Sequence, residues 1–406
     1  MSVVTKVAKQ QKPSTFGLIL LVVGIIFIAM NLRAPITSVG PVVSLIRDDL
    51  NVSNTVIGIL TTIPLLAFGL LSPFAPKLAR KLGMELTLFF VLIVLTIGLV
   101  LRPLAGIVPL YTGTLLIGAG IAIANVLMPA FVKMKFPKNI GVMTGIYSIS
   151  MNLTAALAAG LSIPLANAGS GWKLSVGIWM IVGILAVIFW VPQLFKRDVP
   201  QTKKVTDGKK KSLLHSKLAW QITLFMGLQS LLFYCFAAWY PEILQERGMN
   251  ASKAGWMLSL IQFAQLPVTF IMPIIAAKMH NQLKLVWLTA ITLILGIVFV
   301  ASGVMALIIP ASILMGIGTG TAFSLAMMFF SLRTDDVFEA ADLSAMAQSI
   351  GYLLAATGPV LFGFLYDFTG GWMAPFGLLI IATIVLFISG LGAGRRTTIA
   401  QEAATN

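Results

Sequence analysis

The sequence predicts an all-α integral membrane protein with twelve transmembrane helices in two pseudo-symmetric six-helix bundles. Three observations predict this class: an apolar composition, twelve long apolar segments, and a repeat with a period of about 200 residues. Of the 406 residues, 58% are hydrophobic and 10% are charged, whereas average soluble domains carry roughly 25% charged residues. No globular core of this size can bury so much apolar surface, so lipid is the expected solvent.

The apolar segments are each roughly 18 to 30 residues long, which is enough to cross a ~30 Å hydrocarbon core as a helix. The first is expected to remain as a span, because no small-residue cleavage site follows it as in a signal peptide. The segments cover about residues 16–45, 54–76, 86–103, 109–132, 140–164, 172–192, 218–242, 253–277, 283–303, 306–331, 341–365 and 371–393.

The net charge of +15 follows the topology of these segments. If the N-terminus is cytoplasmic, 22 of the 28 Lys and Arg residues fall in inner connections and tails, and Arg33 alone lies within a span. This positive-inside bias predicts a multi-pass protein of the bacterial plasma membrane with both termini cytoplasmic. The basic run 196–217 contains no aromatic residues, so it predicts a cytoplasmic linker and not a nucleic-acid site. The outer connections hold Arg47, Arg102, Lys173, Arg247 and Lys253.

The two halves of the chain resemble each other at a nearly constant offset. GAGIAIANVLMPAF (118–131) recurs as GIGTGTAFSLAMMF (316–329), and the Gly-Trp pair at 171–172 recurs at 371–372. Because each half has an even number of spans, the repeat is parallel and its axis runs along the membrane normal. The predicted organisation is a tail (1–15), a first bundle (16–192), a linker (193–217), a second bundle (218–393) and a tail (394–406).

Twelve spans, a six-plus-six duplication and a basic central loop resemble the major facilitator superfamily, from residue 16 to about 393. NLRAPITSVGPVV (31–43), followed by GLLSPFAPKLARKLG (69–83), is similar to the cyanate/2-nitroimidazole transporter (CynX/NimT) family. The superfamily loop G-x-L-A-D-R-x-G-R-R reads PKLARKLGME here, with Arg80 in place of the acid. The resemblance implies a transporter whose substrates are cyanate-like anions or nitroimidazole-like heteroaromatics.

Arg33 is the candidate centre of the binding site. It lies about seventeen residues into the first span, near the midplane, where a charge costs about 2.5–3.5 kcal/mol on insertion scales. None of the 13 acidic residues is expected at this depth, and Glu242 comes nearest, at the outer end of the seventh span. The donors of Arg33 would then bind amides, carbonyls, water or a ligand acceptor. A structural arginine is the alternative.

The repeat places aromatic residues opposite this cation. An offset of 200 aligns Pro41 with Pro241 and therefore Arg33 with Phe233. Other polar residues at depth fall on spans that line the cavity in the superfamily, although packing through interhelical hydrogen bonds is an equal alternative for each of them. For Trp239 the alternative is an interfacial belt. The candidate substrate-binding residues are Arg33, Asn31, Thr37, Asn125, Tyr147, Asn152, Phe233, Tyr234, Trp239, Gln262, Gln265, Gln348 and Tyr352.

These observations favour a secondary or facilitative transporter that moves a small polar, anionic or heteroaromatic solute by alternating access. The alternative is a proton-coupled multidrug efflux antiporter, which usually requires a membrane-embedded carboxylate. An enzyme or receptor is disfavoured, and the acidic stretch RTDDVFEAAD (333–342) is expected to be a solvated loop and not a metal site. No phosphate-binding G-x-x-x-x-G-K-[ST] motif is present, so no nucleotide is expected. No metal or cofactor is predicted, and the superfamily resemblance implies a monomer.

Overall fold

Among the residues that the structure describes, twelve helices are long and apolar enough to cross a membrane. The computed structural model describes residues 15–52, 54–195 and 213–405. The predicted N-terminal tail and most of the predicted linker lie outside these residues. Within them the secondary structure is helical throughout, and the predicted fold class is confirmed.

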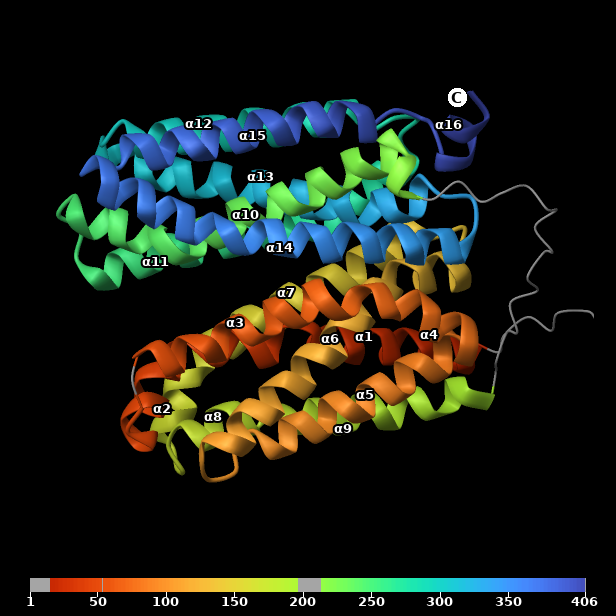
Figure 1. Ribbon diagram of the computed structural model, residues 1–406, viewed down its shortest axis with the longest axis horizontal. Helices are drawn as coiled ribbons and strands as arrows, with labels where there is room; N and C mark the ends of the chain where they lie inside the picture. The colour runs from red at the N-terminus through yellow and green to blue at the C-terminus, as the bar shows by residue number, and fades with distance from the viewer. Residues whose placement is uncertain (1–14, 53, 196–212, 406) are drawn as a thin grey trace, which may run out of the picture.

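The first half of the chain forms one bundle and the second half forms another, as Figure 1 shows. The first bundle comprises α1 (Thr15–Thr37), η1 (Gly40–Val42), α2 (Val43–Leu50), α3 (Asn54–Leu71), η2 (Ser72–Phe74), α4 (Ala75–Leu82), α5 (Met84–Leu101), α6 (Ile107–Lys135), α7 (Ile140–Asn167), α8 (Trp172–Gly177), α9 (Trp179–Trp190) and η3 (Val191–Phe195). The second comprises η4 (Leu213–His215), α10 (Lys217–Glu246), α11 (Ala251–Lys278), α12 (Leu283–Ala301), η5 (Met305–Leu307), α13 (Ile308–Leu332), α14 (Val337–Thr369), α15 (Met373–Ala393) and α16 (Ile399–Thr405).

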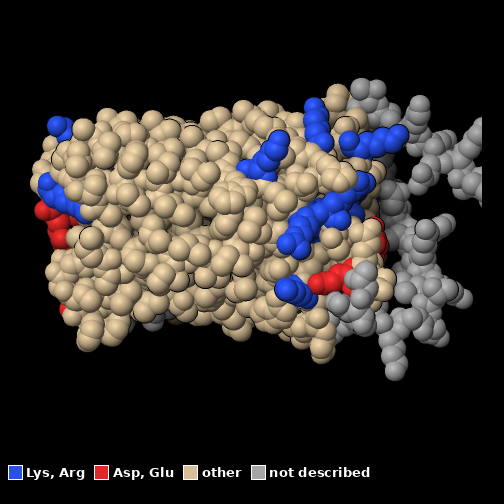
Figure 2. All heavy atoms as spheres, turned by 90° about the horizontal axis from the view of Figure 1, so that it is seen from above, with Lys and Arg blue, Asp and Glu red and all other residues tan. Residues whose placement is uncertain are grey.

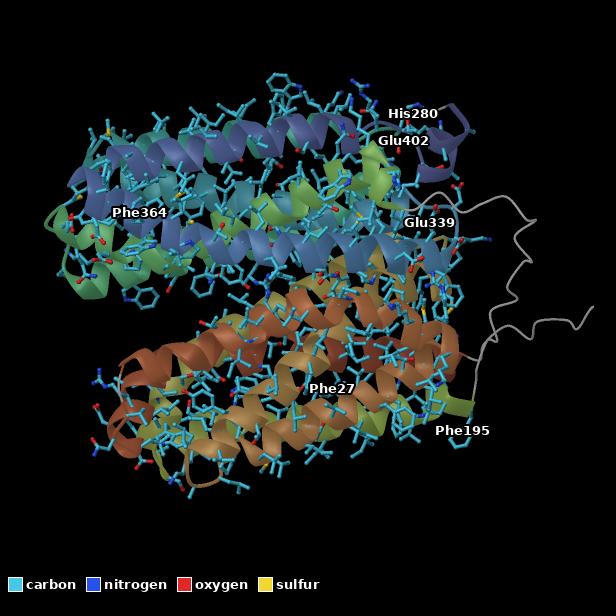
Figure 3. All side chains as sticks on the ribbon, in the orientation of Figure 1. Phe27, Phe195, His280, Glu339, Phe364 and Glu402 are labelled. Carbon is cyan, nitrogen blue, oxygen red and sulfur yellow. The ribbon has the colours of Figure 1, made fainter. Side chains whose placement is uncertain are left out.

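The two ends of the molecule differ in what they carry. We call the end at which η3 stops and α10 begins the linker end, on the right in Figure 1, and the other the far end. Helix α16 also lies at the linker end, where Glu402 accepts a hydrogen bond from the backbone N–H of Leu218 (3.1 Å). Figure 3 places Glu339, His280 and Glu402 at the linker end and Phe364 towards the far end.

Charged residues also distinguish the linker end from the far end. On the face drawn in Figure 2, Lys and Arg gather towards the linker end, and a smaller charged group lies at the far end. The surface between them holds other residues, and many large apolar side chains of the spans are exposed, such as Val360 at 73% and Ile381 at 61%. An exposed apolar band between two polar ends is the surface of a protein that spans a bilayer.

The bundles pack against each other through α7 with α11 and through α14 with α3 and α6. Glycine allows the closest approach. A Cβ on Gly141 would lie 2.5 Å from the carbonyl oxygen of Pro273, and one on Gly145 would lie 2.6 Å from that of Phe270. Because these pairs lie near the start of α7 and the end of α11, the tightest contact of these two helices is at the linker end.

The first span is broken close to Arg33. Helix α1 ends at Thr37, two residues after Pro35, and the chain continues through η1 and α2 to Leu50. Proline removes a backbone donor and clashes with the preceding turn, so a helix loosens where it occurs. The sequence predicted a single span over 16–45, and the break places Arg33 four residues before the end of α1.

Arg102 holds this break from the connection that follows α5, where it was predicted, but it is buried and not in water. Its side chain is only 1% exposed. Its guanidinium donates to the carbonyl oxygens of Pro35 (2.5 Å) and Val176 (3.1 Å). Arg333 is likewise buried, at 4% exposure, and donates to the carbonyl of Ala393 (2.6 Å). Charge counting assigned these two arginines to solvated connections, and for both the expected exposure to water was wrong.

Candidate functional site

A small pocket lies between the bundles, near the middle of the helices that form it. About 10 Å³ of it is open to a water-sized sphere, which is room for about one water molecule. One lining residue comes from the first bundle and the others from α10, α11, α13 and α14 of the second. The pocket is lined by Arg33, Gln229, Ser230, Phe233, Tyr234, Gln265, Thr319, Phe323 and Tyr352. We call it the central pocket.

Arg33 meets the second bundle through two aromatic rings. Its guanidinium carbon lies 5.1 Å from the ring centre of Phe233 on α10 and 5.3 Å from that of Phe323 on α13. Both distances are within the range of a cation–π contact. Within the part of the chain that the structure describes, its guanidinium makes no hydrogen bond and no ion pair. Arg33 is therefore held by π-electrons and not by a carboxylate.

This arrangement leaves the hydrogen-bonding capacity of Arg33 unused. The guanidinium has five N–H donors that lie in its plane and point outward from its edge. No hydrogen bond to these donors is found among the described residues, so they are available to a carboxylate, a nitro group or another planar acceptor, which can bind in a bidentate manner. The lining of the central pocket therefore suits an electron-rich group next to aromatic surface, and such a group needs more room than the water-sized space of this state.

The polar residues that the second bundle contributes are mostly paired among themselves. Gln229 donates to the hydroxyl of Ser230 (2.6 Å), and the hydroxyl of Thr319 donates to the carbonyl of Met315 (2.8 Å). Gln265 differs, because its Oε1 atom is buried and has no hydrogen-bond partner among the described residues. The pocket lining contains no Asp or Glu.

Five of the residues proposed from the sequence lie together in this pocket. The offset of 200 placed Phe233 opposite Arg33, and the structure brings these two side chains into contact. Tyr147 of α7 is buried and lies within electrostatic reach of Arg33. The five that line the pocket are Arg33, Phe233, Tyr234, Gln265 and Tyr352.

Two of the other proposed residues lie on α1 and bond within the first bundle. Asn31 donates to the carbonyl of Val182 on α9 (3.2 Å), and Thr37 to that of Ala155 on α7 (3.1 Å). Trp239 of α10 donates to the carbonyl of Pro359 on α14 (2.9 Å), inside the second bundle. These three side chains join helices of one bundle, which is the packing alternative for polar residues at depth.

The remaining proposed residues lie outside the pocket lining. Asn152 donates to the carbonyl of Ser148 (2.9 Å), one turn earlier on its own helix. Gln348 of α14 donates to the backbone carbonyl of Asn125 on α6 (3.0 Å), so this pair joins the two bundles. Gln262 lies on α11, three residues before Gln265, and is partly exposed.

Sequence reasoning missed four pocket residues: Gln229, Ser230, Thr319 and Phe323. Helical spacing could have found two of them, because Gln229 and Ser230 each lie four residues before an aromatic candidate, Phe233 and Tyr234. The repeat could have found Phe323, which aligns with Asn125 at the offset of 198. For Thr319, among the small residues of GIGTGTAF, we find no comparable signal.

A second set of contacts joins the bundles at the linker end. Arg80 pairs with Asp342 of α14, and its guanidinium carbon lies 5.5 Å from the ring centre of Phe338. Lys133 of α6 donates to the hydroxyl of Thr334 (2.8 Å). We call these the linker-end contacts. The superfamily loop carries an acid at the position of Arg80. Here that position holds a base, and its ion-pair partner on α14 is the acid.

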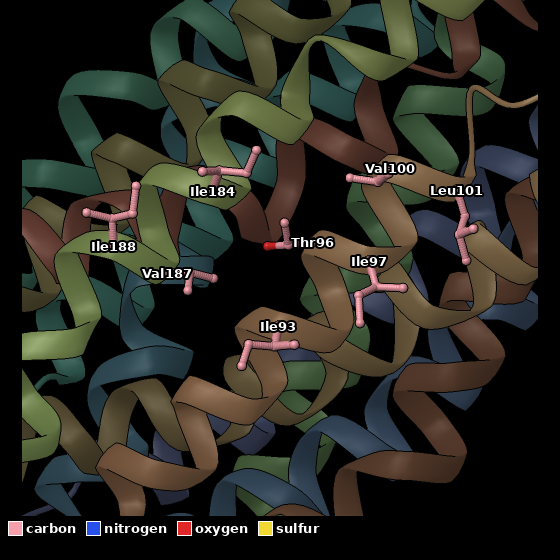
Figure 4. A pocket seen from close by; sticks show the side chains of 8 residues that line it. All are labelled: Ile93, Thr96, Ile97, Val100, Leu101, Ile184, Val187 and Ile188. Atoms are coloured by element: carbon pink, nitrogen blue, oxygen red, sulfur yellow. The ribbon is translucent and has the colours of Figure 1, made fainter.

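A larger hollow is apolar and lies on the outer surface. Figure 4 shows it between α5 and α9, with about 330 Å³ open to a water-sized sphere. Its one polar side chain, Thr96, donates its hydroxyl to the carbonyl of Leu92 (2.7 Å). Lipid-facing residues such as Ile188, 55% exposed, form its walls. It offers no group that could orient a polar solute, so the central pocket is the candidate site.

Two six-helix bundles with a polar pocket between them at mid-depth are the architecture of a membrane transporter. Residues 19–356 match the model of the Major Facilitator Superfamily, so the chain belongs to that family. The resemblance inferred from the sequence is confirmed, as is the expectation of a transporter and not an enzyme.

Similar proteins agree with this assignment. The chain is 47% identical to the uncharacterized transporter YycB of Bacillus subtilis (strain 168), over 94% of this chain and 95% of that protein. It is 36% identical to the 2-nitroimidazole transporter of Escherichia coli (strain K12), over 93% and 96% of the two chains. It is 24% identical to the cyanate transport protein CynX of the same strain, over 90% and 94%.

The fold also matches solved structures. The proton:xylose symporter XylE superposes with a TM-score of 0.74 over 95% of this chain and 98% of that chain, at 12% sequence identity. Such low identity carries the fold alone, and the twelve-helix arrangement is common to both proteins.

Proposed function

We propose that the chain carries a small planar anion, or a small heteroaromatic molecule with a strong acceptor group, across the membrane by alternating access. The observation that supports this proposal is the state of Arg33. Its guanidinium lies near the rings of Phe233 and Phe323, and its N–H donors have no hydrogen-bond partner among the described residues. Such a group repels cations and attracts electron-rich planar acceptors. Relatives named as transporters of 2-nitroimidazole and of cyanate fit this class of solute.

The direction of insertion follows from the charge distribution. Because the basic connections, the linker and the C-terminal segment lie at the linker end, we place that end in the cytoplasm of a bacterial cell, with both termini inside. The linker-end contacts then close the cytoplasmic side, and the central pocket exchanges with the outside once the far end is open.

The mode of coupling between transport and protons is inferred from the acidic residues. The central pocket contains no carboxylate that could titrate, so facilitated transport, or symport in which the substrate itself carries the proton, fits better than proton antiport. For the same reason, and because Arg33 repels lipophilic cations, the pocket supports multidrug efflux less well.

Arg33 variants test this proposal. Binding of 2-nitroimidazole and of cyanate is measured by thermal stabilisation of the purified protein, and uptake is measured in proteoliposomes. We expect Arg33→Ala to weaken binding at least about 100-fold, because bonds to a charged group contribute about 1.5–3 kcal/mol each. Arg33→Lys keeps the charge but loses the bidentate edge, so it should recover only part of the affinity.

The control is Arg47→Lys, a change at an exposed arginine outside the pocket, which should behave like the parent. If both Arg33 variants fold, bind and transport like the parent, then Arg33 has a structural role and the proposal fails. A panel that adds lipophilic cations gives a second test, because a preference for them would reverse the proposed solute class.

A further inference from the structure

One acceptor in the central pocket is unsatisfied. Gln265 of α11 is 2% exposed and lines the pocket together with Arg33, and its Oε1 atom is buried without a hydrogen-bond partner among the described residues. Buried polar side-chain atoms in proteins nearly always have a partner, and the exceptions call for an explanation. The position of Gln265 in the candidate site suggests one, namely a partner that arrives with the ligand.

The rest of the pocket makes this acceptor stand out. Arg33 offers donors only. The Nε2 of Gln229 donates to the hydroxyl of Ser230 (2.6 Å), and the hydroxyl of Thr319 donates to the carbonyl of Met315 (2.8 Å). Among the described lining residues, Gln265 is the one with a buried, unpartnered polar atom. A ligand that complements the pocket therefore needs two features: a hydrogen-bond acceptor for Arg33 and a hydrogen-bond donor for Gln265.

We propose that Gln265 is a specificity-determining residue that selects ligands carrying an N–H or O–H donor in addition to the acceptor group bound by Arg33. This inference rests on the proposed function and narrows its substrate class from electron-rich planar solutes to bifunctional ones. A ligand with the same ring and the same acceptor but no donor leaves Oε1 buried and unpaired. Sites built to hydrogen-bond a substrate group reject the analogue that lacks it.

Two ring compounds isolate the donor. 2-Nitropyrrole and 2-nitrofuran have the same nitro group and similar ring size, but the first has a ring N–H where the second has an oxygen. Because the oxygen is an acceptor, it also repels Oε1. We expect the parent protein to bind 2-nitropyrrole about 10- to 100-fold more tightly than 2-nitrofuran. Equal affinities, or a preference for 2-nitrofuran, would overturn the inference without any variant being made.

The variant Gln265→Met removes the acceptor while keeping an unbranched side chain of similar length. It should weaken 2-nitropyrrole binding, leave 2-nitrofuran binding unchanged or tighter, and bring the affinity ratio close to one. The matched control is Gln262→Met, three residues earlier on α11 and outside the pocket lining, which should keep the ratio of the parent. A parental ratio in folded Gln265→Met contradicts the inference, and Gln265→Leu replaces that variant if it does not fold.

The outcomes separate this inference from the proposed function. If Arg33→Ala abolishes binding of both compounds and Gln265→Met changes only their ratio, both proposals stand. If Arg33→Ala abolishes binding but the parent does not discriminate between the compounds, the proposed function stands and the role of Gln265 is rejected. If the parent binds neither compound, nor 2-nitroimidazole or cyanate, both are rejected.

Discussion

The two bundles meet in two chemically different places. At the linker end, Arg80 has Asp342 and Lys133 has Thr334, so the charged groups that cross between the bundles have polar partners. In the central pocket, the guanidinium of Arg33 contacts two rings, and neither it nor the Oε1 of Gln265 has a hydrogen-bond partner among the described residues. The linker-end contacts are therefore complete without a ligand. Under the proposed function they close this end of the molecule, and the central pocket keeps donors and an acceptor for the solute.

Among the following variants, a change in the close packing at the linker end is expected to have the largest effect on the contact between the bundles. In Gly141→Ala, the new Cβ would lie 2.5 Å from the carbonyl of Pro273, so α7 and α11 must move apart. Overpacking of this kind costs about 1–3 kcal/mol, and we expect the buried interface to become accessible about 5- to 150-fold more often. The measurement is maleimide labelling of Ser331→Cys, a residue bonded across the bundles to the carbonyl of Pro129 (3.2 Å).

This assay is clean because the chain has a single native cysteine, Cys235, which is replaced by Ala in the labelled protein. Gly160→Ala is the matched control, since this glycine also lies on α7 but has open space around it. Equal labelling rates for the two glycine variants would show that the contact of α7 with α11 does not keep this end closed.

The rings in the central pocket give the next largest effect. Phe323→Leu removes one face of the cation–π contact at 5.3 Å, which is worth about 0.5–2 kcal/mol. Binding of 2-nitroimidazole should weaken about 3- to 30-fold by calorimetry, and Phe233→Leu should have a similar effect. Phe364→Leu, at a side chain of α14 that is 59% exposed, serves as the control. Unchanged affinity in both pocket variants would mean that the rings only fill space.

The ion pair at the linker end gives the smallest effect. Arg80 and Asp342 are 39% and 29% exposed, and pairs this accessible contribute about 0.2–1 kcal/mol. Asp342→Asn should therefore raise Ser331→Cys labelling only about two- to fivefold, and salt should reduce the difference. The double variant Arg80→Asp with Asp342→Arg should restore the parental rate. If the double variant is labelled at Ser331→Cys as fast as Asp342→Asn is, the two charges do not interact.

Much of the fold could be predicted from the sequence, because the bilayer fixes the length of each span and the repeat fixes their arrangement. Rotation of each helix about its axis could not, since a helix that is apolar all round gives no periodic signal. Asn31 and Trp239 show the consequence: Asn31 lies two residues before Arg33 and Trp239 lies on the same helix as Phe233, yet both bond inside their own bundle.

The contact between Arg33 and Phe233 was predictable because the repeat relates the position of Arg33 in the first bundle to that of Phe233 in the second. Pseudo-symmetry relates two positions in space without any need to know how each helix is rotated, and the observed separation is 5.1 Å. Arg102 was not predictable in this way. Its burial depends on the end of α1 near Pro35, where a backbone carbonyl accepts a hydrogen bond from Arg102. Hydropathy carries no information about which backbone groups lack a partner.

The break in α1 also bears on the charge that a solute must bring. The backbone dipoles of a helix add up to roughly half a negative charge at its C-terminal end, and the effect is confined to the last turn. Because α1 ends at Thr37, that partial charge lies just beyond Arg33, where the guanidinium of Arg102 binds the carbonyl of Pro35. The main chain at the break is therefore offset by Arg102 and not by Arg33. The charge of Arg33 is thus left for the solute, and under the proposed function an anion or the negative end of a polarised group such as a nitro group balances it.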